Sequence, residues 1–402
     1  MKSHKDTDPT TLWSPLAEHW SLDPHHTYLN HGSFGGAPIA VQEEQRRWLR
    51  QMESRPYQFY VYDFERHIDT ARASLADFLG ADAKDIVFVN NATAGVNSVL
   101  RSLSFAPGDE LLVTNHEYNA SRNALNFVAQ RDGAEVVVVD VPYPVQSPSE
   151  IVDAIMEKVT TRTRLALLDH VTSQTALILP LETIIPKLHE RGIETLIDGA
   201  HAPGMLPLQL NDLQPTYYTG NCHKWLCTPR GAAFLYVARA QQHTIKPLAI
   251  SHGANSTRTD RSAFHLQFDW TGTDDLTAYL CVPKAIEYVG SLVPGGWEEV
   301  RRRNHQLASQ ARRHIANELD IQVPCPDELF GSIATLPLPD GALYPNTAPV
   351  EPLQQQLHDQ YDIEVPVIPW PSSPKRLLRI SAHLYNDMPQ YLYLTEAIKQ
   401  LL

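Results

Sequence analysis

Residues 85–103, DIVFVNNATAGVNSVLRSL, place a short β-branched run directly before a helical pattern. DIVFV is rich in residues that favour strands, whereas AGVNSVLRSL repeats apolar side chains at helical spacing. The same kind of alternation continues along the chain with DELLVT, AEVVVVD, RLALLDHV, IETLID, PTYYTG and AAFLYVA as further strands. Strands that alternate with helices indicate crossover connections and a mostly parallel sheet covered on both faces. The sequence therefore predicts an α/β fold.

The length of 402 residues exceeds the size at which a single core usually stops growing, which favours a large domain and a smaller one. After about residue 283 the pattern changes to a long helix, two short strands and a closing helix. We therefore expect an N-terminal arm over residues 1–40 that packs with the small domain, a large α/β domain over 41–282 and a small α+β domain over 283–402.

Composition excludes several classes of protein. The chain has 43% hydrophobic and 20% charged residues, as folded soluble proteins do, and no apolar run reaches the ~18 residues of a membrane span. A net charge of −13 disfavours binding to nucleic acid or to an anionic membrane. The four cysteines are too few for a disulfide scaffold, and the N-terminus lacks the apolar stretch of a secretory signal. A cytoplasmic location is expected.

Ligands of open α/β sheets bind at the carboxyl ends of the strands, so the residues just after each strand carry the most information. DIVFV is followed by NNATAG, residues 90–95, which leads into a helix. Free N–H groups at a helix start and a threonine hydroxyl suit a phosphate. Plain N-capping by Asn91 or Thr93 is the alternative.

Two further strand ends carry ionisable groups. IETLID ends at Asp198. If this carboxylate is buried, it requires a cationic partner. The alternative is an exposed aspartate in a turn. Residues 219–231, TGNCHKWLCTPRG, set Lys224 in an apolar stretch, where desolvation would lower its pKa. Cys222 and Cys227 are candidate metal ligands, but no second cysteine pair follows, so we predict no metal.

A phosphate site, a carboxylate and a buried lysine after successive strands match the needs of pyridoxal 5′-phosphate. The lysine forms a Schiff base with the aldehyde, the carboxylate keeps the pyridine nitrogen protonated, and the helix start anchors the phosphate. The combination outweighs the separate structural explanation of each feature.

The motifs DGAH (198–201), CHKW (222–225) and TGT (271–273) resemble the class V branch of the fold-type I pyridoxal-phosphate enzymes, which is related to aminotransferases and cysteine desulfurases. The stretches that most resemble its isopenicillin N epimerase-like branch are YLNHGSFGGAP (28–38), NHEYNA (115–120), GNCHKWL (220–226) and LLRISAHLYN (377–386). The resemblance implies a fold-type I transferase with a mostly parallel seven-stranded sheet, and a homodimer with shared active sites.

The resemblance also assigns roles by position. Lys224 corresponds to the Schiff-base lysine, Asp198 to the partner of the pyridine nitrogen and His201 to a neighbour of the ring hydroxyl. The residues expected to hold the phosphate are Ala92, Thr93, Asn221 and His223, together with Thr273 of the partner subunit.

Three more positions are expected beside the cofactor ring. Ser173 stands in HVTSQT, where relatives often have asparagine, and faces the ring hydroxyl or the substrate. Tyr118 of NHEYNA is expected to stack on the ring, with His116 as the substitute, because the stacking residue shifts between relatives. The alternative for either is ordinary packing at a helix start.

The substrate side is assigned to three residues. Arg379 matches the arginine that binds the substrate α-carboxylate, a role that suits its planar, bidentate side chain. A salt bridge at the rim of the pocket is the alternative. Asn30 and His31 are expected to line the pocket, although their glycine-rich setting also permits a structural turn.

The reaction depends on where a proton returns after it leaves Cα. The resemblance favours an amino-acid epimerase or racemase, with Lys224 on one face and Tyr118, His31 or His252 opposite. A C–S lyase acting on a cysteine conjugate or its sulfoxide is the alternative, followed by an aminotransferase. The segment IEVPVIPWPSSPKRLLR before Arg379 lacks the cysteine of desulfurases. An idle binding protein on this scaffold would usually have lost the lysine or the aspartate.

Overall fold

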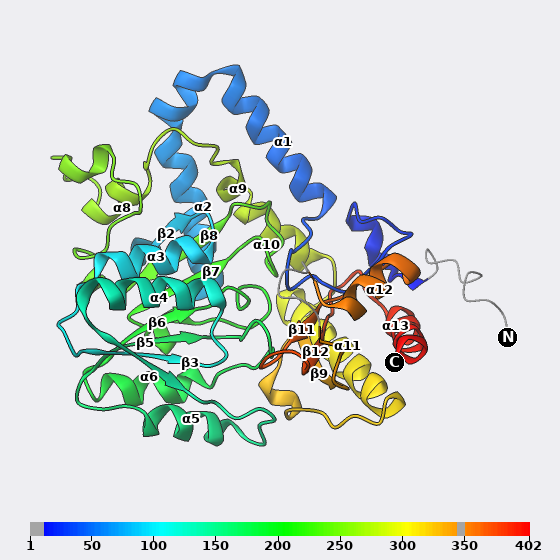
Figure 1. Cartoon of the computed structure of the whole chain (residues 1–402). Helices are drawn as coiled ribbons and strands as arrows, with labels where there is room; N and C mark the ends of the chain where they lie inside the picture. Colours follow the sequence, from blue (N-terminus) through cyan, green and yellow to red (C-terminus); the bar gives the residue numbers. More distant parts are fainter. Residues whose placement is uncertain (1–11, 344–349) are drawn as a thin grey trace.

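A computed structural model describes residues 12–343 and 350–402 of the chain (Figure 1). The first part of the expected N-terminal arm, residues 1–11, lies outside the described residues. Figure 1 shows a large domain built on the central sheet and a smaller domain beside it, which contains the C-terminus.

The central sheet has seven strands in the order β2-β8-β7-β6-β5-β3-β4. They are β2 (Ile86–Val89), β3 (Glu110–Thr114), β4 (Glu135–Val139), β5 (Thr163–Asp169), β6 (Glu194–Asp198), β7 (Tyr217–Asn221) and β8 (Ala233–Val237). Neighbouring strands from β4 to β7 pair in parallel, whereas β8 is antiparallel to both β2 and β7. The predicted mostly parallel seven-stranded sheet is confirmed.

Helices cover both faces of this sheet. Those of the large domain are α1 (Ile39–Ser54), α2 (Phe64–Leu79), α3 (Ala92–Ser102), α4 (Asn119–Asp132), α5 (Pro148–Glu157), α6 (Leu181–His189), α7 (Leu210–Leu213), α8 (Ala263–Phe268) and α9 (Thr277–Leu280). Apolar residues of α3 and α4 join one core cluster, and those of α2, α5 and α6 join another. The strands feed both clusters alternately, as Leu167 and Leu168 on β5 show. Burial of each such leucine contributes about 1.5–3 kcal/mol.

The small domain combines helices with an antiparallel sheet of order β11-β12-β9. Its elements are α10 (Val282–Ser291), α11 (Gly296–Glu318), β9 (Ile333–Leu338), α12 (Pro352–Tyr361), β10 (Ile363–Glu364), β11 (Val367–Pro369), β12 (Arg376–Ser381) and α13 (Met388–Leu401). This arrangement confirms the predicted α+β character of the C-terminal part.

The expected long helix after residue 283 is in fact two helices, α10 and α11. α10 ends at Ser291 and α11 begins at Gly296, and Gly295 and Gly296 have φ angles of 99° and 65°. Glycine adopts a positive φ at little cost, which lets the chain turn between the two helices. The sequence carries a signal for this break, because residues 291–296 read SLVPGG.

The N-terminal arm contacts the C-terminal part of the chain directly. Strand β1 (Thr27–Tyr28) pairs in parallel with β10, and the backbone N–H of Ser14 donates to the carbonyl of Tyr385 at 3.2 Å. We propose that the N-terminal arm ends at residue 40 and that the large domain ends at residue 282.

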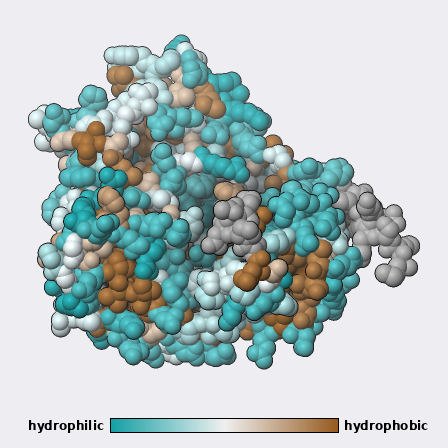
Figure 2. Space-filling view, viewed as in Figure 1, coloured by the Kyte–Doolittle hydropathy of each residue, from teal (hydrophilic) through white to brown (hydrophobic). Residues whose placement is uncertain are grey.

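The surface is largely hydrophilic on the face shown in Figure 2, and its apolar patches are separated from one another. Within residues 12–343 and 350–402, no helix is both long enough and apolar enough to cross a bilayer.

Candidate active site

The predicted functional residues gather where the central strands end. Asp198 is the last residue of β6, Asn221 is the last residue of β7, and Lys224 follows three positions later. Because β6 and β7 are parallel neighbours with Asp198 opposite Thr219, their carboxyl ends lie at the same edge of the sheet. The fold thus concentrates chemistry-bearing side chains at that edge.

The amine of Lys224 lies 3.2 Å from Nε2 of His201. Burial and the charge of Arg379 lower the pKa of Lys224 to about 8, as the sequence predicted in direction. Burial and the charge of Lys224 hold the pKa of His201 well below its usual value, so its neutral ring accepts from the lysine. The other ring nitrogen, Nδ1, is buried without a hydrogen-bond partner in the described part of the chain.

The carboxylate of Asp198 is buried and receives two hydrogen bonds. The hydroxyl of Ser121 donates to Oδ2 at 2.7 Å, and the backbone N–H of Ala200 donates to Oδ1 at 3.1 Å. Burial raises the pKa of Asp198, while these two donors and the charge of Lys224 act in the opposite direction. Sequence reasoning missed Ser121, although it lies on α4, the helix that begins directly after Tyr118.

The start of α3 faces the end of β7. The backbone N–H of Ala92 donates to Oδ1 of Asn221 at 2.9 Å, and Asn91, not Thr93, caps the helix through the N–H of Ala94 at 2.8 Å. A side chain is excluded at Gly95, because its Cβ would lie 2.1 Å from Oγ1 of Thr219. The close packing brings the helix start against the strand end, as the expected phosphate site requires.

One ring nitrogen of His223 is already used in a hydrogen bond to the backbone. Its Nδ1 donates to the carbonyl of Ala232 at 2.9 Å, and burial lowers its pKa to about 4. The neutral ring therefore offers an acceptor at Nε2. A phosphate placed there would favour protonation of His223 by its own negative charge.

The structure separates the two expected stacking residues. His116 is buried, with Nδ1 at 2.7 Å from Oγ1 of Thr175 and Nε2 donating to the carbonyl of Val141 at 3.1 Å. Tyr118 lies just before α4 with 45% of its surface exposed. Because the ring of His116 packs against Trp370, with the ring centroids 4.7 Å apart, Tyr118 remains our prediction for the stacking residue.

Arg379, on β12, is a buried cation held by neutral partners. Its Nη1 donates to the carbonyl oxygen of Ser173 at 2.6 Å and approaches its hydroxyl at 3.3 Å, while Nη2 donates to the hydroxyl of Ser33. Burial lowers the pKa of Arg379 to about 10. No acidic side chain of the described residues forms an ion pair with it, which argues against the rim salt bridge and leaves the charge available for an anion.

Asn30 and His31 lie behind this region. Asn30 donates to Oε1 of Glu364 at 3.3 Å, and its own Oδ1 is buried without a partner among the described residues. His31 is fully buried and stacks on His383 with the ring centroids 4.3 Å apart.

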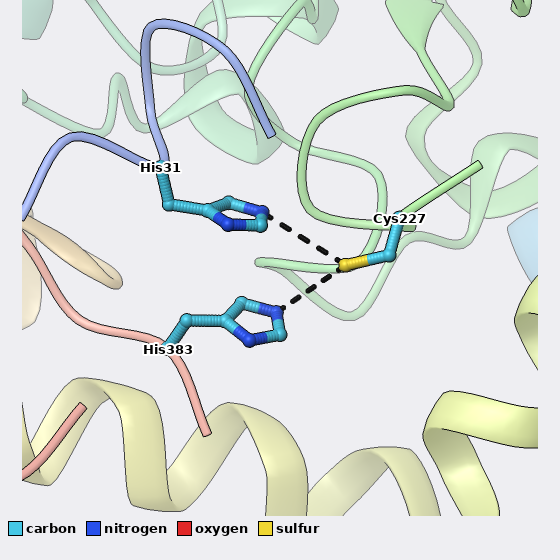
Figure 3. Close-up of side chains that lie close together, drawn as sticks. All are labelled: His31, Cys227 and His383. Carbon is cyan, nitrogen blue, oxygen red and sulfur yellow. Dashed lines mark hydrogen bonds between the residues drawn. The ribbon is translucent and has the colours of Figure 1, made fainter. Parts of the chain in front are cut away.

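The rings of His31 and His383 converge on Cys227 (Figure 3). The sulfur lies 3.4 Å from Nε2 of His383 and 3.9 Å from Nε2 of His31. Nε2 of His31 also lies 3.1 Å from the carbonyl oxygen of Lys224, which receives the N–H of Cys227 at 3.0 Å. Two members of the cluster, His31 and Cys227, therefore hold the backbone carbonyl of Lys224 in place.

The cluster is explained by hydrogen bonds without a metal. A carbonyl only accepts, so Nε2 of His31 carries a proton and Nδ1 accepts from the hydroxyl of Tyr385 at 2.8 Å. A metal would need the Nε2 lone pair that this tautomer lacks. Burial also raises the pKa of the Cys227 thiol, which disfavours the thiolate that metals bind.

Thr273 and His252 lie on exposed segments. Thr273 belongs to an exposed loop before α9, and His252 lines a surface pocket together with Tyr60 and Arg258. Neither side chain forms a hydrogen bond or ion pair to Lys224 within the described chain. A contribution of Thr273 to the partner subunit stays a prediction.

Two acidic residues beside Asp198 were missed by sequence reasoning. Glu117 and Asp169 are buried and each bring a carboxylate oxygen within 4.8 Å of the others and of Asp198. The signal for Asp169 was present, since RLALLDHV ends a strand in aspartate exactly as its neighbour IETLID does. Glu117 gave no comparable signal, because it lies in a turn.

We expect Gly35→Ala to impair the site while leaving the overall fold intact. A Cβ at Gly35 would lie 2.6 Å from the carbonyl oxygen of Lys224 and 2.7 Å from that of His223. The backbone of the lysine must shift to relieve the contact, and a displacement of about 1 Å lowers turnover on the order of 10²-fold. Steady-state kinetics and circular dichroism would measure both effects.

Gly36→Ala is the matched control for this substitution. Its Cβ would meet Trp20 at 3.4 Å, an ordinary van der Waals contact. Equal activity of the two variants would contradict the inferred contact between Gly35 and the lysine backbone.

The chain is similar to known proteins in both sequence and fold. The family model described as Aminotransferase class-V matches residues 39–341. The chain is 35% identical to isopenicillin N epimerase of Amycolatopsis lactamdurans, over 97% of this chain and 99% of that protein. It is 27% identical to a probable chloroplastic L-cysteine desulfhydrase of Arabidopsis thaliana, over 94% of this chain and 83% of that protein. A solved complex of the cystine C–S lyase C-DES with its product cysteine persulfide has a TM-score of 0.77 at 22% identity, covering 92% of this chain and 96% of that one.

Proposed function

Because the chain belongs to the aminotransferase class-V family of pyridoxal-phosphate-dependent enzymes, we propose that it epimerises the Cα of an amino acid that carries a bulky tail. The family resemblance of the sequence motifs is confirmed. The epimerase assignment is supported by the 35% identity to isopenicillin N epimerase over nearly the full length of both chains.

The residues present fit pyridoxal phosphate. A closed apolar core would not retain a buried lysine with a pKa of about 8, a buried carboxylate at a strand end and a buried Nδ1 of His201 that has no partner among the described residues. Lys224 would hold the aldehyde carbon, Asp198 the ring nitrogen and the start of α3 the phosphate. When bound, this cofactor withdraws electrons from Cα and so makes its proton removable.

The chain's own groups supply binding and proton transfer. Arg379 is positioned to bind the substrate α-carboxylate through a charge-assisted, bidentate contact. The amine of Lys224 is neutral in part at physiological pH, so it can take a proton from one face of Cα. Tyr118 is our choice for the donor on the opposite face, because both ring nitrogens of His31 are engaged elsewhere.

The observation that carries the proposal is the buried charge of Arg379, which has no acidic partner within residues 12–343 and 350–402, together with the low-pKa lysine. To test it, the enzyme is incubated in D₂O with a panel of L-amino acids, including ones with a free α-amine and a bulky acylated side chain, followed by chiral chromatography and mass spectrometry. Deuterium at Cα together with the inverted enantiomer supports epimerisation. Retention of the substrate's hydrogen and configuration with every member of the panel would contradict it.

A C–S lyase is the second candidate. It is supported by the similarity to an L-cysteine desulfhydrase and by the fold shared with a cystine C–S lyase. Pyruvate and ammonia released from cysteine or cystine would establish this reaction, whereas a keto acid that appears only with an acceptor keto acid would indicate transamination. Lys224→Ala is the control in each assay.

We propose that the active enzyme is a homodimer whose sites are shared between subunits. Thr273 on its exposed loop is the residue we expect to cross to the partner. Multi-angle light scattering at micromolar concentration would show a mass near twice the 45.2 kDa of the chain.

A further inference from the structure

Three carboxylates meet at the strand ends beside the lysine. Asp169 ends β5 and lies directly opposite Asp198 on β6, while Glu117 approaches from the turn before α4. One oxygen of each lies within 4.8 Å of the other two. The exposed fractions of Glu117, Asp169 and Asp198 are 6%, 3% and 2%, so water does not screen them.

Hydrogen bonds are distributed unequally among the three acids. Asp198 accepts from Ser121 and from the backbone of Ala200. Both oxygens of Glu117 and Oδ2 of Asp169 are buried without a donor in the described part of the chain. An ionised carboxylate in such a position has no partner for its charge, whereas a protonated one needs only a neighbouring carboxylate oxygen.

The surrounding charges do not compensate three anions. The positive charge of Lys224 opposes the burial-driven rise in the pKa of Asp169 and of Asp198, but it is a single charge. Arg122 of α4 lies near Glu117, but its side chain donates to Asn126. The phenol of Tyr218 on β7 is neutral beside Asp198, since burial holds its pKa well above the usual range. Burial and mutual repulsion accordingly raise the pKa of Glu117 and of Asp169 well above their ordinary values.

We propose that Glu117 and Asp169 hold one proton between them at neutral pH and act as positioning residues that leave Asp198 as the ionised member of the group. The proton bridges two carboxylate oxygens, as in other buried pairs of acids that cannot both ionise. The contact of Asp198 with the ring nitrogen of the cofactor rests on the proposed function, and there the bridged pair would fix the charge beside Asp198.

The test follows unfolding in urea against pH with the cofactor-free full-length chain. A shared proton means that this pair binds more protons in the folded chain than in the unfolded one above the unfolded pKa of about 4, so the pair's contribution to stability falls as pH rises. One such proton raises the unfolding equilibrium constant by up to about tenfold per pH unit. We expect Glu117→Gln and Asp169→Asn each to flatten this slope between roughly pH 5 and pH 8 and to stabilise the protein at the upper end.

Glu351→Gln is the matched control, because Glu351 is a buried carboxylate with full partners. It pairs with Arg376 at 2.6 Å and accepts the N–H of Leu353 at the start of α12 at 2.6 Å. This variant is expected to lose stability at every pH. If Glu117→Gln and Asp169→Asn behave in the same way, or keep the slope of the unmodified chain, the proposal is wrong.

Two further readouts keep the outcome decisive if a variant folds poorly. The infrared spectrum of the unmodified protein at neutral pH should contain the C=O stretch of a buried carboxylic acid, shifted in D₂O. Its absence would overturn the proposal. Stabilisation of the unmodified protein by millimolar Mg²⁺ or Mn²⁺ would also overturn it, because three ionised carboxylates would then be a cation site. None of these measurements depends on turnover, so they are independent of the proposed reaction.

Discussion

Lys224→Ala is expected to abolish turnover, lowering kcat by at least about 10³-fold. The amine has no substitute, since the other polar group that contacts it, His201, is held neutral by burial and by the lysine's own charge. The purified protein should also lose the absorbance band that borohydride removes from a lysine-linked pyridoxal phosphate. Lys84→Ala, which alters an exposed lysine before β2, should leave both the band and kcat unchanged.

The same lysine predicts a pH dependence. Its pKa of about 8 lies below the ordinary lysine value, because burial and Arg379 disfavour the charged form. Only the neutral amine attacks an aldehyde, so the rate at which the cofactor-free protein takes up pyridoxal phosphate should rise with pH and level off above about 8. A stopped-flow series across this range measures the midpoint. A rate that keeps increasing up to pH 10 would show that Lys224 has an ordinary pKa.

Asp198→Asn is expected to lower kcat on the order of 10²- to 10³-fold, the loss typical when one preorganised electrostatic partner is removed. The amide keeps the shape of the carboxylate and can still accept from Ser121, but it carries no charge to hold a proton on a ring nitrogen. Cofactor affinity should fall in parallel, which fluorescence titration of the cofactor-free protein measures. Asp212→Asn, an exposed carboxylate on α7, is the control.

The stability of Asp198→Asn separates a functional loss from a folding defect. Replacing Asp198 removes its repulsion with the one negative charge left on the Glu117–Asp169 pair, about 3 kcal/mol at ~5 Å. The cofactor-free variant should therefore unfold at the same urea concentration as the unmodified protein or at a higher one. Retention of kcat within tenfold would contradict the role of Asp198, whatever the stability.

The sequence alone determined the α/β class and the family. Its alternation of β-branched runs with helical periodicity predicted a mostly parallel sheet, because that periodicity reflects which side chains must be buried, and the family resemblance implied seven strands. Lys224 and Asp198 were identifiable for a related reason: an ionisable residue in an apolar run is costly unless it is used. Their roles, like those of Arg379 and Tyr118, remain predictions that the experiments above address.

Only the tertiary structure decided which side chains meet. Glu117, Asp169 and Asp198 lie far apart in the chain, and the parallel pairing of β5 with β6 is what confines their charges together. The structure likewise shows that His116 is engaged on both ring nitrogens and that the expected long helix is two helices. Local sequence encodes burial and backbone preference, whereas hydrogen-bond partners and shared protons depend on distances that exist only after the strands have assembled.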